Sequence, residues 1–227
     1  MPRVSFERQL RHLQEELLVL GSMVEEALAR SVQVLLKRDT EGAQQLIAGD
    51  QTVNERRYAI EGEALTLIAT QQPMAGDLRT LAAVLEVATE LERIGDYAKG
   101  IARISLMIGA TPLLKPAAGI PMMADKAIDM LRQSLDAFVR RDAERARTIP
   151  SQDDVVDAMY NQVYQQLIAA VVADPTIIDQ ANRLLWAAHN LERAADRVSN
   201  ICERVLFTVT GEMMELDQPE TGIESLG

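Results

Sequence analysis

The sequence predicts an all-α protein built from two tandem antiparallel three-helix bundles that are related by internal duplication. Long stretches with apolar residues at helical spacing are separated by short segments that contain proline or glycine. Aromatic residues make up only 4% of the chain, whereas alanine, leucine, glutamate, arginine and glutamine fill the long stretches. In addition, motifs from the first half recur in the same order in the second half.

The first bundle is expected to occupy residues 1–110. Its first helix runs from about residue 5 to 37. A second helix begins behind a cap at Asp39 or Thr40 and ends before Pro73, since a proline disfavours helix at the residue before it. The third helix runs from about 76 to 109. Such helices of about 30 residues are roughly 45 Å long, and short turns make them pack antiparallel.

The second bundle is expected at residues 122–211, after a proline-rich linker at 111–121. Its helices are predicted at about 122–139, from a cap at Asp142 to Ala173, and from the Asp174-Pro175 turn to about Gly211. The remaining residues, 212–227, read as an acidic tail.

Three matches between the halves indicate a duplication. VRRDAERA at 139–146 corresponds to LKRDTEGA at 36–43, and LERAADRVSNIC at 191–202 corresponds to LERIGDYAKGIA at 91–102. Between them, DDVVD at 153–157 corresponds to DQTVN at 50–54. A generic coiled coil has the same periodicity, but it does not account for three matches in the same order.

Composition excludes several classes of protein. The formal net charge of -11 argues against nucleic acid as a partner, because nucleic-acid binding relies on a basic face. A single cysteine, Cys202, excludes an internal disulfide framework and fits a reducing compartment. We see neither a secretory leader nor an apolar run near the roughly 20 residues that cross a bilayer. We therefore expect a soluble cytoplasmic protein.

Acidic pairs four residues apart occur on the third helix of each unit, Glu92 with Asp96 and Glu192 with Asp196. Residues at this spacing share one helix face, where like charges cost a few tenths of a kcal/mol. The simpler interpretation is a solvated face on which the neighbouring arginines screen the charges. Helical phase instead places the pairs on the shoulder of the apolar stripe.

The register of each hairpin brings further polar side chains to these pairs. Asp50 with Asp96, and Asn54 with Glu92, are centred on Pro73. In the second unit the corresponding pairs are centred on the Asp174-Pro175 turn. The sequence therefore predicts two clusters, whose members are Asp50, Asn54, Glu92 and Asp96 in the first unit and Asp153, Asp157, Glu192 and Asp196 in the second.

Carboxylates gathered beside a core need protons or cations to neutralise them. Oxygen ligands suit Mg, Mn, Ca or Fe. The lone Cys202 argues against a thiolate zinc site, and having only His12 and His189 argues against a di-iron oxidase, although His189 could assist the second cluster. Two alternatives stay open: a metal-dependent hydrolase or oxidase that uses the same carboxylates, and a purely structural helical adaptor. No recognised catalytic motif is present, so we expect no enzyme.

The chain resembles the PhoU family, the phosphate-transport accessory and regulatory proteins of bacteria. The resemblance rests on IATQQPMAGDLR at 68–79, ELERIGDYA at 90–98, NLERAADRVSNICE at 190–203 and VTGE at 209–212. It implies a cytoplasmic protein, usually a homodimer, that associates peripherally with membrane complexes. Its expected partners are the phosphate ABC transporter and its sensor histidine kinase, through which it restrains uptake and keeps the phosphate-starvation response off.

The resemblance also implies metal ligands. Some members of the family hold multinuclear metal clusters, so a multinuclear divalent or ferric metal (Fe, Mn, Mg or Zn) is expected on the motif residues, which are the two carboxylate clusters. The sequence departs from the family pattern at Asn54, which is neutral. We therefore expect the first cluster to bind metal more weakly than the second.

Overall fold

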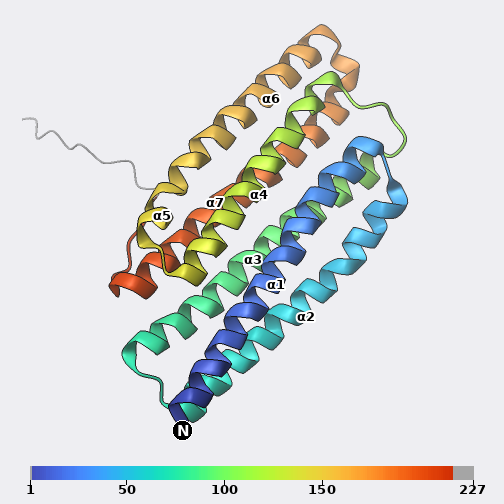
Figure 1. Cartoon of the computed structure of the whole chain (residues 1–227). Helices are drawn as coiled ribbons and strands as arrows, with labels where there is room; N and C mark the ends of the chain where they lie inside the picture. Colours follow the sequence, from blue (N-terminus) through green and yellow to red (C-terminus); the bar gives the residue numbers. More distant parts are fainter. Residues whose placement is uncertain (1, 217–227) are drawn as a thin grey trace, which may run out of the picture.

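The computed structural model describes residues 2–216, and within that range it contains helices and no strand, which confirms the all-α prediction. Figure 1 shows the long helices lying side by side. The α-helices, of which only α5 is short, are α1 (Pro2–Lys37), α2 (Thr40–Gln71), α3 (Ala75–Ile108), α4 (Ile120–Arg140), α5 (Ala143–Thr148), α6 (Asp153–Ala173) and α7 (Ile178–Thr210). Short 3-10 helices span Lys115–Gly119, Pro150–Gln152 and Pro175–Ile177.

The duplication is visible in one turn that is built twice. Arg38 and Arg141 both end a helix in the left-handed conformation, with φ of 57° and 55°. Each is followed by an aspartate whose side chain caps the next helix: Asp39 accepts a hydrogen bond from Gly42 N, and Asp142 accepts one from Arg145 N. The backbone bonds from Asp39 N to Val34 O and from Asp142 N to Ala137 O close both helix ends in the same way.

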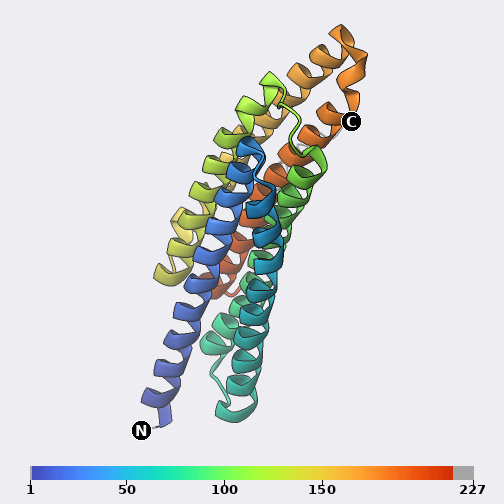
Figure 2. The same ribbon diagram turned by 90° about the vertical axis from the view of Figure 1, so that its right-hand side faces the viewer.

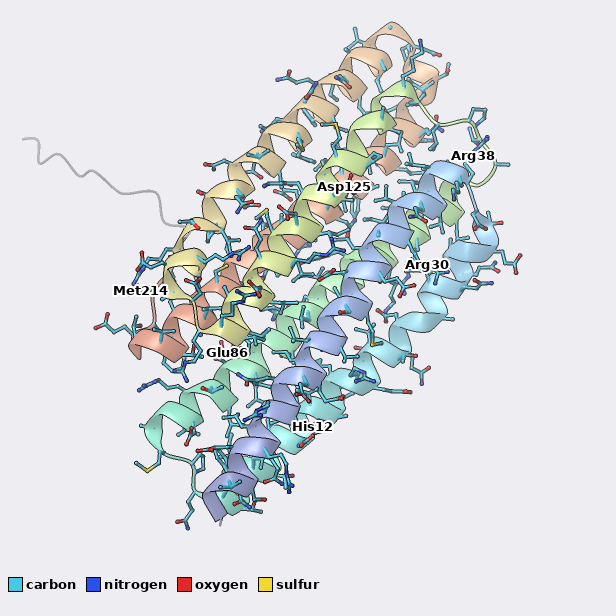
Figure 3. The ribbon with its side chains drawn as sticks, in the orientation of Figure 1. His12, Arg30, Arg38, Glu86, Asp125 and Met214 are labelled. Atoms are coloured by element: carbon cyan, nitrogen blue, oxygen red, sulfur yellow. The ribbon has the colours of Figure 1, made fainter. Side chains whose placement is uncertain are left out.

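The guanidinium groups of the two turn arginines donate hydrogen bonds to backbone carbonyls near the C-terminal ends of α3 and α7. Arg38 donates to the carbonyl of Ala110 at 3.0 Å, beside the linker, as its label in Figure 3 indicates. Arg141 donates to the carbonyl of Thr208 at 2.6 Å. These bonds offset part of the cost of about 1–2 kcal/mol that a left-handed residue with a side chain carries.

One predicted helix is wrong. The stretch from Asp142 to Ala173 is not continuous but divides into α5, a 3-10 turn and α6. Pro150 is the physical reason, because it has no N–H to donate and its ring crowds the carbonyl one turn before it. The break makes Asp153 the first residue of α6. Helix α4 begins at Ile120, inside the stretch expected as linker.

The two units share one continuous hydrophobic core, which residues of both halves form. Helices α3 and α7 pack against each other across the units, while α1 also contacts α4. Figures 1 and 2, two views that differ by a 90° turn, agree that α3 and α7 run together along the molecule. The sequence predicted the two bundles but not this interface.

The α3/α7 contact is symmetric about Gly95 and Ala195, which occupy the same position in the two repeats. Contacting residues lie equal numbers of positions on opposite sides of these two small residues. The pairs are Glu86 with Arg204, Glu90 with Asn200, Tyr97 with Arg193, Gly100 with Asn190, and Met107 O with Arg183. The helices are therefore antiparallel, and the repeat places identical positions face to face at their centre.

The predicted acidic tail is described only as far as residue 216, and 217–227 lie outside the described residues. Met214 and Leu216 pack against the core, and Leu216 N donates to the buried carboxylate of Glu203 at 3.0 Å. Within the described range, no helix has both the length and the apolar character to cross a membrane.

Candidate metal centres

The α2/α3 hairpin brings Asp50 and Asp96 to the same ammonium group. Nζ of Lys99 lies 2.6 Å from Oδ2 of Asp50 and 3.2 Å from Oδ1 of Asp96. The Asp50 side chain is 8% exposed, and it also accepts a hydrogen bond at 3.1 Å from Nδ2 of Asn54. The predicted juxtaposition across the hairpin is thus present, but a lysine stands between the two carboxylates.

Glu92 completes the first cluster, beside a second cation. Burial raises the pKa of Glu92 above 4.5, and the neighbouring charges of Asp96 and Asp50 raise it further. The positive charge of Arg57 acts in the opposite direction and lowers that pKa. Arg57 itself pairs with Glu61 at 2.7 Å.

The first cluster therefore does not fit a metal ion as it stands. Lys99 already pairs with Asp50 and Asp96, the charges of Arg57 and Arg93 lower the pKa of Glu92, and Asn54 directs its amide nitrogen, a donor, toward Asp50. A metal ion would have to displace Lys99 from a hydrogen bond to a buried carboxylate, which is a strong charge-assisted interaction.

The second cluster lies on α6 and α7. Asp153 and Asp157 are in the first two turns of α6, with Oδ1 of Asp153 buried and Asp157 exposed. Glu192 and Asp196 lie one turn apart on α7. Burial raises the pKa of Glu192 above 4.5, followed by the charges of Asp196 and Asp157, so these three carboxylates act on one another.

His189 is the positively chargeable group beside Glu192. Its Nδ1 lies 2.8 Å from Oε2 of Glu192, and this contact lowers the pKa of the glutamate against the effect of burial. The His189 ring also lies near Tyr160, with ring centroids 5.9 Å apart. Burial, and then the charge of Glu192, raises the pKa of Tyr160 above 10.0.

The two clusters differ most in the residues around the carboxylates. Ser199 occupies the repeat position of Lys99, and Tyr160 occupies that of Arg57. Asp157 replaces Asn54, so the second cluster gains an acid where it loses both cations. The second cluster thus has four carboxylates, with His189 beside Glu192, a donor set that suits a cation better than the first cluster does.

Neither cluster is a preassembled centre. Among residues 2–216, no three histidine, cysteine, aspartate or glutamate side chains are gathered tightly enough to hold one metal ion. The second cluster supplies suitable oxygen donors on adjacent helix faces, and its side chains would have to rotate to converge on an ion. Metal binding by either cluster stays a prediction.

Sequence reasoning missed Lys99 and Arg57, the residues that distinguish the first cluster. Both lie within or beside the repeated motifs, so comparing the halves position by position would have shown Lys99 against Ser199 and Arg57 against Tyr160. The reach of Lys99 across the hairpin to Asp50 has no signal in the linear sequence.

The fold and the clusters define a class of protein: two three-helix repeats that share a core, each with carboxylates on its hairpin. Comparison with known families gives the same division, since the PhoU domain matches residues 17–105 and again 120–205. The chain belongs to the PhoU family.

Known relatives match over nearly their full lengths. A protein of Caulobacter vibrioides (strain NA1000 / CB15N) named phosphate-specific transport system accessory protein PhoU homolog is 35% identical over 97% of this chain and 96% of its own. A relative of the same name from Clostridium acetobutylicum is 33% identical over 96% of this chain and 100% of its own.

Two solved structures have the same fold. PhoU from Pseudomonas aeruginosa superimposes with a TM-score of 0.85 at 30% identity, covering 91% of this chain and 100% of that one. The phosphate transport system regulatory protein PhoU from Streptococcus pneumoniae gives a TM-score of 0.86 at 30% identity, covering 93% and 100%.

Proposed function

We propose that this chain is an accessory protein of a phosphate-specific transport system. In this proposal it binds the phosphate ABC transporter and its sensor histidine kinase at the cytoplasmic side of the membrane, as a homodimer. It thereby restrains uptake and keeps the phosphate-starvation response off when phosphate is plentiful. The observation that carries the proposal is the family match across both repeats, together with relatives that are named phosphate-specific transport system accessory proteins.

The second cluster would give this protein a cation requirement. Asp153, Asp157, Glu192 and Asp196 supply only oxygen donors, for which a divalent or ferric ion (Fe, Mn, Mg or Zn), in one or more copies, is the proposed ligand. Such an ion would neutralise charges that now repel one another across the α6/α7 hairpin. A more rigid hairpin would follow, and it offers one surface for a partner to recognise.

Binding, not catalysis, is the role that the site chemistry supports. Metal-assisted hydrolysis needs an open coordination position and an acid or base placed beside the substrate. The carboxylates of the second cluster are spread along two helix faces. The charges that shift the pKa of Glu192 are those of His189, Asp157 and Asp196.

The proposal is tested in a bacterium whose own PhoU gene has been deleted. Expression of the chain in phosphate-rich medium should silence a phosphate-starvation promoter and lower the uptake of radioactive phosphate. In parallel, the purified chain should bind the isolated nucleotide-binding subunit of the transporter and the cytoplasmic part of the kinase. An active promoter with undiminished uptake, despite normal amounts of folded chain, would contradict the proposal.

A further inference from the structure

Helices α3 and α7 form an arginine-lined cleft at the centre of their contact. The cleft has a volume of about 430 Å³, and its walls are Arg93, Asp96, Tyr97, Arg193 and Arg197. Three of these five residues are arginine, in a chain whose net charge is -11. The cleft is therefore a positively charged site on a protein that is negatively charged as a whole.

The internal repeat assembles the cleft. Arg93 and Arg193 occupy the same repeat position, as do Tyr97 and Arg197, and all four lie two residues from Gly95 or Ala195. Antiparallel packing thus places Arg193 over the Tyr97 ring, with its guanidinium carbon 4.9 Å from the ring centroid. This cation–π contact holds the Arg193 guanidinium over the ring and uses none of its N–H donors.

A buried glutamate holds the other two arginines. Glu90 is 8% exposed; its Oε1 accepts a hydrogen bond from Arg93 at 2.5 Å, and its Oε2 lies 3.7 Å from Nη1 of Arg197. Asn200 donates to the same Oε2 at 3.1 Å. One carboxylate therefore orients two guanidinium groups and neutralises the charge of only one.

Most guanidinium donors in the cleft are unused. Among the described residues, Arg193 makes no ion pair and no hydrogen bond, and Arg197 has only its long contact with Glu90. Each guanidinium carries five N–H donors. Asp96, which also lines the cleft, pairs with Lys99 at 3.2 Å. Arg93 is 49% exposed and Arg197 26%, so solvent and small solutes reach both.

We propose that this cleft binds a small phosphate-bearing anion, either inorganic phosphate or a phosphorylated metabolite. Several planar guanidinium forks that converge from two helices match the many oxygens of a phosphoryl group better than those of a halide or a single carboxylate. The volume admits one such group with part of its substituent. The negative charge of the rest of the molecule disfavours long polyanions. This site is separate from the proposed function, since it uses neither the second cluster nor a transporter.

Equilibrium dialysis with radiolabelled inorganic phosphate tests the proposal, with unlabelled diphosphate, ATP, a sugar phosphate and sulfate as competitors. The matched variants are Arg193→Gln and Arg140→Gln, because Arg140 is an exposed arginine of α4, paired with Asp136 and outside the cleft. We expect saturable binding of one anion per chain and a loss of affinity of about tenfold or more in Arg193→Gln. Arg140→Gln should bind as the unaltered chain does.

The competitors distinguish the sources of the phosphoryl group. Displacement by diphosphate or ATP at lower concentrations than by inorganic phosphate would assign the cleft to a phosphorylated metabolite, and the reverse order would assign it to free phosphate. Arg193 has no carboxylate partner among the described residues to leave unpaired, and circular dichroism checks that its variant folds. Absence of saturable binding, or equal affinity in both variants, would overturn the proposal.

Discussion

Nζ of Lys99 on α3 lies 2.6 Å from Oδ2 of Asp50 on α2, and this contact makes the two carboxylate clusters unequal. In the first unit the ammonium group of Lys99 neutralises the carboxylates, as a bound metal cation would. At the equivalent position of the second unit stands Ser199, which is fully buried and carries no charge. The two repeats therefore share a fold but differ in whether a lysine neutralises their carboxylates.

Lys99→Met should destabilise the protein at pH 7 by about 1–2 kcal/mol, since it leaves the buried Asp50 without its cation. The hydrogen bond to Asp50 raises the pKa of Lys99 above 10.5. Its contribution is therefore complete below pH 10.5 and is lost as pH rises through the higher folded-state pKa. Urea unfolding at pH 7 and above pH 10.5 measures both effects.

Lys115→Met is the control for this prediction, because Lys115 is exposed in the linker. It should unfold like the unaltered chain at both pH values. If Lys99→Met also unfolded with an unchanged midpoint at pH 7, Lys99 would not be the counter-ion of Asp50.

Glu192→Gln should stabilise the metal-free protein at neutral pH by about 0.5 kcal/mol, the size of a relieved like-charge contact. Burial and then Asp196 raise the pKa of Glu192 above 4.5, so the ionised glutamate penalises the folded state. The sign of the shift means that this penalty is absent below pH 4.5 and grows as pH rises through the folded-state pKa.

Thermal unfolding in the presence of a chelator, at pH 4 and pH 7, measures this difference. The exposed Glu15 of α1 provides the control variant, Glu15→Gln, for which no pH-dependent gain is expected. If Glu192→Gln were instead less stable than the unaltered chain at both pH 7 and pH 4, the glutamate side chain would stabilise the folded state, and the prediction would be contradicted.

Ala195→Leu should destabilise the whole protein by about 1–3 kcal/mol through overpacking. Ala195 is fully buried at the centre of the α3/α7 contact, and the core is continuous through both units. Unfolding in urea, followed by the fluorescence of the single tryptophan Trp186 and by circular dichroism, should stay one transition and move to lower urea. Ala59→Leu, at an exposed position of α2, should leave the midpoint unchanged. Two separate transitions would mean that the units fold independently.

Much of the fold could be predicted because its turns carry strong local signals. Asp39 caps α2, and Gln72 before Pro73 ends it, as expected from residues whose backbone chemistry acts within a few positions. The break at Pro150 carried the same kind of signal and was overlooked. The α3/α7 interface had none, since helical periodicity shows that a helix has a buried face but not which helix covers it.

The candidate site could be predicted only in part, for a related reason. Equal distances from a proline turn placed Asp50 opposite Asp96, because an antiparallel hairpin has a single register. Which long side chains extend across that hairpin depends on rotamers, so the lysine between the two aspartates could not be read from spacing. The same holds for Arg193 over Tyr97, where the contact joins two different repeats.

The metal-loaded protein should not hydrolyse phosphate esters. A chromogenic phosphate monoester incubated with protein and Mn²⁺ should be cleaved no faster than with Mn²⁺ alone, because the histidine of the second cluster is paired with Glu192 at 2.8 Å and is not held for a substrate. Glu192→Gln is the reference for contaminating activity. Robust turnover that disappears in Glu192→Gln would favour the hydrolase alternative over a binding role.

The most direct test of the unequal clusters is the metal content of protein purified without chelator and dialysed against Mn²⁺ or Fe²⁺. The account predicts bound metal in the unaltered chain and in Asp50→Asn, and its loss in Asp157→Asn/Glu192→Gln. It also predicts additional metal in Asn54→Asp/Arg57→Tyr/Lys99→Ser, which gives the first cluster its fourth carboxylate and removes Arg57 and Lys99. Equal metal in all four proteins, or a loss caused by Asp50→Asn alone, would contradict it.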